Sequence, residues 1–166
     1  MGRPRKGSFD QATRARVLQA AELQFGEHGY RDARLEDIAA AAGIRRPSLL
    51  YHFGSKQQLY ELVVQHAFAQ IRAALELGMA HGGSFAERLD STIDELVTFE
   101  TTHRPLMSVV LRELVDPRGQ AAATVAAEFV VVVDALEQFV VAARGDALGD
   151  LPVRAAIMQL IMGHLS

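Results

Sequence analysis

The stretch LEDIAAAAGIRRPSLLYHFGSKQQL, residues 35–59, decides the fold of this chain. Its apolar residues follow helical spacing on both sides of Gly43, so it predicts two short helices joined by a sharp turn. Glycine permits that turn because it has no Cβ, and the small Ala39 lets the two helices approach closely. Pro47 suits the first turn of the second helix, which we expect to end near Phe53. This spacing is typical of a helix-turn-helix.

The outer side of that second helix carries candidate DNA contacts. Apolar residues at positions 38, 44, 49 and 53 are expected to hold the helix against the first one, which leaves its polar side chains outside. Arginine can donate two hydrogen bonds to guanine, serine can bond a base edge or a phosphate, and tyrosine can touch a thymine methyl group. Lys56, at the start of the next helix, is expected to meet a backbone phosphate. The expected contacts on the second helix are Arg45, Arg46, Pro47, Ser48, Tyr51 and His52.

Charge is divided unevenly along the chain, whose formal net charge is −3. Residues 1–60 hold 10 Lys and Arg against 6 Asp and Glu, whereas residues 61–166 hold 7 against 14. The first part therefore carries +4 and the second −7. This asymmetry indicates an anion-binding module joined to a module with another task.

Helical patterns also cover the rest of the chain, and no alternating strand pattern interrupts them, so we expect an all-α fold. The first helix is expected to begin near Ser8 or Asp10 and to stop at Gly29. Residues 120–144 are so apolar on every side that we expect other helices to surround them, and the last helix is expected to continue to Ser166. The remaining helix starts are marked by the pairs Ser55 with Gln58 and Ser84 with Glu87, and by Pro105 and Pro152.

With its flanking helices, the stretch quoted above resembles the signature of the TetR family of transcriptional regulators, and the likeness spans about residues 12–68. The resemblance implies an all-α homodimer. It also implies an N-terminal three-helix DNA-binding domain with a helix-turn-helix, followed by a helical-bundle domain that binds an effector and dimerises. We expect a flexible basic arm at residues 1–9, the DNA-binding domain at 10–55 with the family match continuing to about 70, and the effector-binding and dimerisation domain at 56–166.

Three departures from the family pattern matter. The family usually has Thr or Ser at the start of the second helix, where this chain has Ala33 and Arg34. Arg34 is expected to supply the phosphate contact, and Asp32 is the nearest candidate to cap the helix. The family's usual tyrosine is replaced by Leu50, so Tyr51 is expected to carry more of the interface. The family dimerises through its last two helices, and the second is missing here; either the chain is incomplete or its dimer differs, and we favour incompleteness.

The acidic part of the chain contains the candidate effector pocket. A largely apolar set of side chains there fits a mostly apolar ligand, with Asp134 and Glu137 as polar groups nearby. The same side chains could instead fill an ordinary core. The candidate pocket residues are Phe99, His103, Met107, Val110, Leu111, Leu114, Phe129 and Val133.

These observations predict a sequence-specific transcriptional regulator, a repressor that a small, mostly apolar effector releases from a palindromic operator. Its expected partners are double-stranded operator DNA, an unidentified effector and a second copy of the chain, as a homodimer. The alternative is a helical small-molecule-binding protein or an enzyme whose N-terminal hairpin is only structural. Salt-dependent DNA binding would separate the two.

Several classes of function are not expected. The chain has no Cys, and its single Glu-x-x-His at residues 100–103 lacks the second copy that a di-iron bundle needs. We therefore expect no catalytic residues, no metal site, no cofactor and no enzyme activity. No apolar run approaches the roughly 20 residues that span a bilayer, so we expect a cytoplasmic protein without a membrane segment.

Overall fold

A computed structural model of the chain describes residues 11–116, 118–144 and 152–163. Within these ranges it contains helices and no strand, which confirms the all-α prediction. The expected basic arm and the last residues of the chain, 164–166, lie outside the described ranges. The helices are α1 (Gln11–Asp32), α2 (Leu35–Ala41), α3 (Arg46–Phe53), α4 (Lys56–Met79), α5 (Phe85–Thr102), α6 (Arg104–Val115), α7 (Ala122–Arg144) and α8 (Val153–Gly163).

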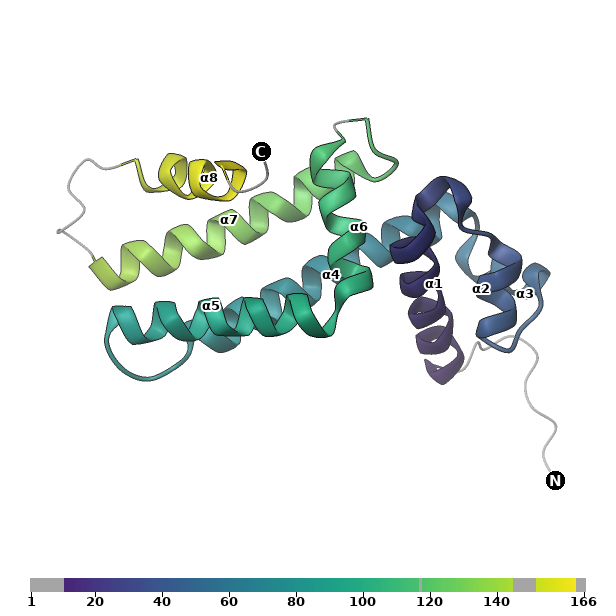
Figure 1. Cartoon of the computed structure of the whole chain (residues 1–166), viewed down its shortest axis with the longest axis horizontal. Coiled ribbons are helices and arrows are strands. Elements are labelled where there is room, and N and C mark those ends of the chain that lie inside the picture. The colour runs from purple at the N-terminus through teal and green to yellow at the C-terminus, as the bar shows by residue number, and fades with distance from the viewer. Residues whose placement is uncertain (1–10, 117, 145–151, 164–166) are drawn as a thin grey trace, which may run out of the picture.

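Helices α1, α2 and α3 gather at one end of the molecule, and α4 runs from that end along its length (Figure 1). Helix α5 returns along α4, and α7 packs against α4 with α8 beside it. Helix α6 stands across the end of α5 and packs on α1. The helices from α5 onward are therefore linked to the N-terminal helices through α4, which packs on α1 and α3, and through α6, which packs on α1.

The predicted helix-turn-helix is present in α2 and α3. Gly43 has a φ of 70°, in the left-handed region that the sharp turn needs. Ile38, Leu49 and Phe53 are buried, so the inner side of α3 is fixed against its neighbours. The predicted stop of the first helix is visible as a break at Gly29, where φ is 72° and ψ 177°, before α1 ends at Asp32.

The capping residues predicted from the sequence are observed in the structure, with one exception. The Ser55 side chain accepts a hydrogen bond from the Gln58 amide, and Ser84 forms a reciprocal capping box with Glu87. The Ser84 hydrogen bonds hold the pKa of Glu87 below its ordinary value. The expectation that Asp32 caps α2 is wrong, because that residue closes α1, and the extended residue before α2 is Arg34, whose side chain makes no cap bond.

The expectation that other helices surround α7 is also wrong for the single chain. Val132, Val133 and Phe139 are buried against the rest of the molecule. On the other side, Val130 and Val131 are each 47% exposed. Helix α7 thus presents an apolar outer surface that the described part of the chain does not cover.

Helices α4 and α5 come very close where Gly78 faces Thr92. A Cβ placed on Gly78 would lie 2.3 Å from the Thr92 Cα, far inside van der Waals contact. Thr92 is buried, and its hydroxyl donates to the Arg88 carbonyl at 2.7 Å. Glycine at position 78 therefore sets the spacing of the α4–α5 hairpin.

Candidate DNA interface and effector groove

The outer side of α3 is an exposed and largely polar surface. Tyr51 is 79% exposed, although Leu49 and Phe53 on the same short helix are buried. His52 is half-buried and lies edge-on to Tyr51, with ring centroids 4.9 Å apart. A large exposed aromatic ring, on a helix whose opposite side is buried, is well placed to enter a DNA groove. The other predicted contacts on this helix, Arg45, Arg46, Pro47 and Ser48, are all exposed.

Arg46 is oriented by an ion pair with α2. Its Nε lies 3.0 Å from Oε1 of Glu36, and both side chains are more than half exposed. A guanidinium group has five N–H donors in a planar fork. The pair therefore uses one edge of Arg46 and leaves the remaining donors for a base.

Two of the predicted basic residues, Arg34 and Lys56, flank this helix. Arg34 is exposed, and within the described ranges its side chain has no hydrogen bond or ion pair. Lys56 donates to the Arg31 carbonyl at 3.0 Å and lies 4.8 Å from the centre of the Tyr30 ring. Because an ammonium has three donors, Lys56 keeps donors for a phosphate while it ties α4 to the end of α1.

The sequence analysis missed Arg31. A basic residue in the last turn of a helix is ordinarily interpreted as a partner of the helix dipole, which gave no reason to single it out. The structure shows that Arg31 is exposed and that the Lys56 ammonium donates to its backbone carbonyl. Arg31 thus extends the basic surface from α3 towards the end of α1.

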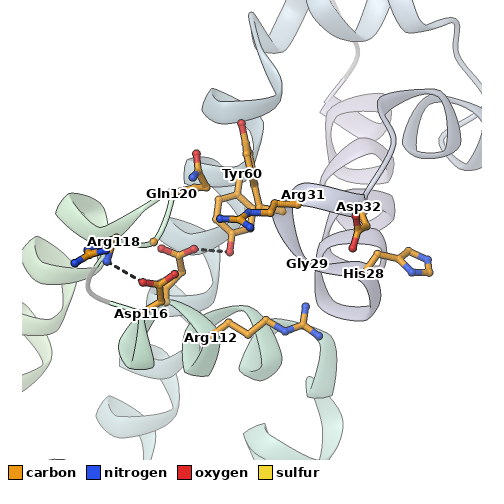
Figure 2. Close-up of a pocket in the computed structure, with 12 residues that line it drawn as sticks. His28, Gly29, Arg31, Asp32, Tyr60, Arg112, Asp116, Arg118 and Gln120 are labelled. Carbon is orange, nitrogen blue, oxygen red and sulfur yellow. Dashed lines mark hydrogen bonds between the residues drawn. The ribbon is translucent and has the colours of Figure 1, made fainter.

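A buried hydrogen bond joins α4 to α6 behind this surface. The Tyr60 hydroxyl donates to Oε1 of Glu113 at 2.8 Å (Figure 2). Oε2 of Glu113 accepts from the Ala121 amide at 2.9 Å. The Tyr60 ring packs edge-on against Phe25 and Tyr30 of α1, at centroid distances of 4.9 and 5.1 Å. Burial, reinforced by Glu113, raises the pKa of Tyr60 well above its ordinary value.

Helix α6 is also bonded directly to α1. The Ser108 hydroxyl donates to the Gly26 carbonyl and Arg112 Nη1 donates to the Phe25 carbonyl, each at 3.1 Å. Gly26 lies against Pro105 so closely that a Cβ there would be 2.6 Å from the Pro105 Cα. A polar pocket of about 400 Å³ opens beside this joint, between the end of α1, Tyr60 and the α6–α7 connection (Figure 2).

A second hollow, the effector groove, lies between α4 and α5 and has a volume of about 240 Å³. Two of the predicted pocket residues, Phe99 and His103, line it, and their rings stack at a centroid distance of 5.1 Å. Val110 and Val133 are instead buried in the core, Met107, Leu114 and Phe129 pack against that core, and Leu111 is 38% exposed. The groove is lined by Gln70, Ala73, Ala74, Leu77, Glu95, Thr98, Phe99, Thr102 and His103.

The polar groups of the groove are not those that the sequence suggested. Asp134 and Glu137 both form ion pairs with Arg154 of α8 and do not line the groove. Its polar lining comes instead from residues that the sequence analysis passed over, chiefly Gln70 and Glu95. Helical spacing alone gave no signal for them, because it does not fix how α4 and α5 are rotated about their axes.

A chain of hydrogen bonds leads from the groove to α1. His66 Nδ1 lies 2.6 Å from Oε1 of Glu22 on α1, and its Nε2 lies 3.2 Å from Nε2 of Gln70. Both contacts are satisfied when a neutral His66 donates from Nδ1 to Glu22 and accepts from the Gln70 amide, a tautomer assigned from the bonding pattern. That arrangement leaves the Gln70 carbonyl oxygen as a free acceptor.

Two kinds of site are absent from the described ranges. No group of three or more His, Cys, Asp or Glu side chains there could hold a metal ion. Nor is any helix within those ranges long and apolar enough to cross a bilayer.

Helices α2 and α3 are joined by a turn at Gly43, and the outer side of α3 is exposed. These features define a helix-turn-helix protein. Residues 17–63 match the family described as bacterial regulatory proteins of the tetR family. The repressor NicS of Pseudomonas putida is 35% identical over 71 residues, which cover 41% of this chain and 34% of NicS. Residues 17–63 of this chain are therefore a tetR-family domain.

Solved structures share the fold over nearly the whole chain. The fatty acid degradation regulator FadR of Bacillus halodurans superposes with a TM-score of 0.78 at 20% identity, covering 92% of this chain and 82% of FadR. AibR, solved with isovaleryl coenzyme A and operator DNA, gives a TM-score of 0.70 at 20% identity and covers 93% and 84% of the two chains. The curated relatives are matched over half of their own length or less.

Proposed function

We propose that this chain is a sequence-specific DNA-binding repressor, and not an enzyme, that a small effector releases from a palindromic operator. The carrying observation is the exposed outer side of α3, where Arg46 and Tyr51 project from a helix whose opposite side is buried. A homodimer would place one such helix on each half-site. NicS, a repressor by name, supports this direction of control.

The proposed DNA contacts fall into two groups with different tasks. Side chains on α3 would read bases in the major groove. The basic side chains around α3 would bind phosphates and fix the orientation of the helix on the duplex. The base-reading or groove-contacting group is Arg45, Arg46, Pro47, Ser48, Tyr51 and His52, and the phosphate group is Arg34 and Lys56, to which we add Arg31.

Release would follow from the position of the effector groove. The groove ends at His103, immediately before α6, and α6 is bonded to α1 through Ser108 and Arg112. A ligand that moves His103 and the start of α6 would therefore move the proposed DNA-binding helices as well. In a dimer, the resulting change in the spacing of the two α3 helices would remove the contacts of one half-site.

Arg46→Ala tests the base-reading task. We expect it to weaken binding to an operator selected from random DNA by about 1–3 kcal/mol and to relax the preference at one base pair. Arg34→Ala should instead lower affinity for all sequences and flatten the dependence of affinity on salt. Fluorescence anisotropy with operator and scrambled duplexes at several salt concentrations measures both effects.

Arg104→Ala is the matched control, because it removes an exposed arginine from α6 rather than from the DNA-binding helices. It should leave both affinities unchanged. Equal losses on operator and scrambled DNA for Arg46→Ala would exclude a base contact. The complete absence of salt-dependent DNA binding would favour the alternative, a helical small-molecule-binding protein or enzyme.

A further inference from the structure

We propose that the effector groove between α4 and α5 takes a small organic cation with an apolar body, whose charged nitrogen is held by Glu95. This inference rests on the proposed function, because it names the chemical class of the effector. It requires only the groove itself, all of whose lining residues are described.

The charge of the lining favours a cation. Glu95 contributes a carboxylate, and the described residues of the lining include no Lys or Arg. Within the described ranges, no hydrogen bond or ion pair occupies the half-buried side chain of Glu95. Glu100 on the same helix adds to the negative charge near the groove. An ammonium group would give the Glu95 carboxylate the partner that the chain does not provide.

The rest of the lining favours an apolar body with an N–H donor. Ala73, Ala74 and Leu77 of α4 and the Phe99–His103 stack form apolar and aromatic walls. Such a wall with few polar groups is typical of a site for a small organic molecule. The Gln70 amide nitrogen bonds His66, and within the described ranges no hydrogen bond occupies the Gln70 carbonyl oxygen. It can accept a second hydrogen bond from the same ammonium group.

The same groups select against anions. A ligand carboxylate placed here would face the Glu95 carboxylate and the Gln70 oxygen, and the described residues of the lining include no Lys or Arg to balance it. Repulsion of this kind separates ligands of similar shape more strongly than attraction alone. The groove is therefore expected to separate amines from acids that have the same apolar body.

Benzylammonium is a suitable probe, with benzyl alcohol as the neutral comparator and benzoate as the anionic one. Titration followed by ¹H–¹⁵N NMR should give saturable shifts for benzylammonium at residues 70–77 and 95–103, and much weaker ones for the comparators. Glu95→Gln should reduce the affinity at least about tenfold. Asp94→Asn is the matched control, because it removes the same charge from the neighbouring exposed position, and it should leave the affinity within about twofold.

The inference is overturned if benzoate binds as tightly as benzylammonium, or if Glu95→Gln and Asp94→Asn have equal effects. Operator binding measured on the same samples without the probe separates this inference from the proposed function. Normal operator binding without benzylammonium binding overturns the inference alone. Benzylammonium binding in a protein that does not bind DNA supports the cation site in the groove and overturns the proposed repressor function.

Discussion

Gly78→Ala is expected to lower the free energy of unfolding by about 3 kcal/mol. In most helices this change is stabilising by roughly 0.5–1 kcal/mol, because alanine has the higher helix propensity. Here the new methyl group would lie 2.3 Å from the Thr92 Cα and 2.7 Å from its nitrogen, so it meets backbone atoms that cannot rotate away. The two helices would have to separate, which would also widen the groove between them.

Gly82→Ala provides the control for this prediction. A Cβ at Gly82 would have no neighbour within 4 Å, and the residue lies in the short connection after α4. Urea unfolding followed by circular dichroism should therefore show almost no change for Gly82→Ala and a large one for Gly78→Ala. Equal stability of the two variants would mean that α4 and α5 do not approach as closely as described.

Tyr60→Phe is expected to cost about 1–3 kcal/mol of stability, because it removes the hydroxyl donor from a buried carboxylate. Glu113 is 7% exposed and would keep only the Ala121 amide as a partner. Tyr30→Phe is the matched control. Tyr30 belongs to the same ring cluster, but within the described ranges its hydroxyl makes no hydrogen bond, so its loss should cost little. Urea denaturation midpoints of the two variants provide the comparison, and equal values would contradict the buried hydrogen bond.

Alkaline pH gives an independent test of the same bond. Burial and Glu113 raise the pKa of Tyr60 in the folded chain, whereas the unfolded chain releases this proton near the ordinary tyrosine pKa of about 10. Ionisation therefore favours the unfolded state, so stability is full below about pH 10 and falls as the pH rises above it. Tyr60→Phe should be less stable near neutral pH but should lose less further stability on going to high pH.

The helix-turn-helix could be predicted because its signals are local. Gly43 and Pro47 fix a turn and a helix start within a few residues, and the buried positions of α3 follow from helical spacing. Once the inner side of α3 is known, the outer side follows by elimination. The exposed arginines and Tyr51 were therefore identifiable before any tertiary contact was known.

The effector groove could not be predicted in the same way. Asp134 and Glu137 were expected near a ligand because they interrupt an apolar helix, but they face Arg154 of α8 instead. Gln70 and Glu95 reach the groove because of how α4 and α5 pack, which depends on the close contact at Gly78. Tertiary packing decides which side chains meet across two helices, and the spacing of residues along the sequence does not specify that packing.

The joint between α6 and α1 means that helices α1–α3, which carry the proposed DNA contacts, do not form an independent folding unit. Phe25 is covered in part by Tyr60 of α4, and Gly26 by Pro105 of α6. A fragment ending after α3 would expose this apolar surface to water and lose the bonds from Ser108 and Arg112. In the whole chain, we therefore expect α1–α3 and the helices that pack on them to unfold as one cooperative unit, so substitutions in α6 could abolish the proposed repression by unfolding the proposed DNA-binding helices.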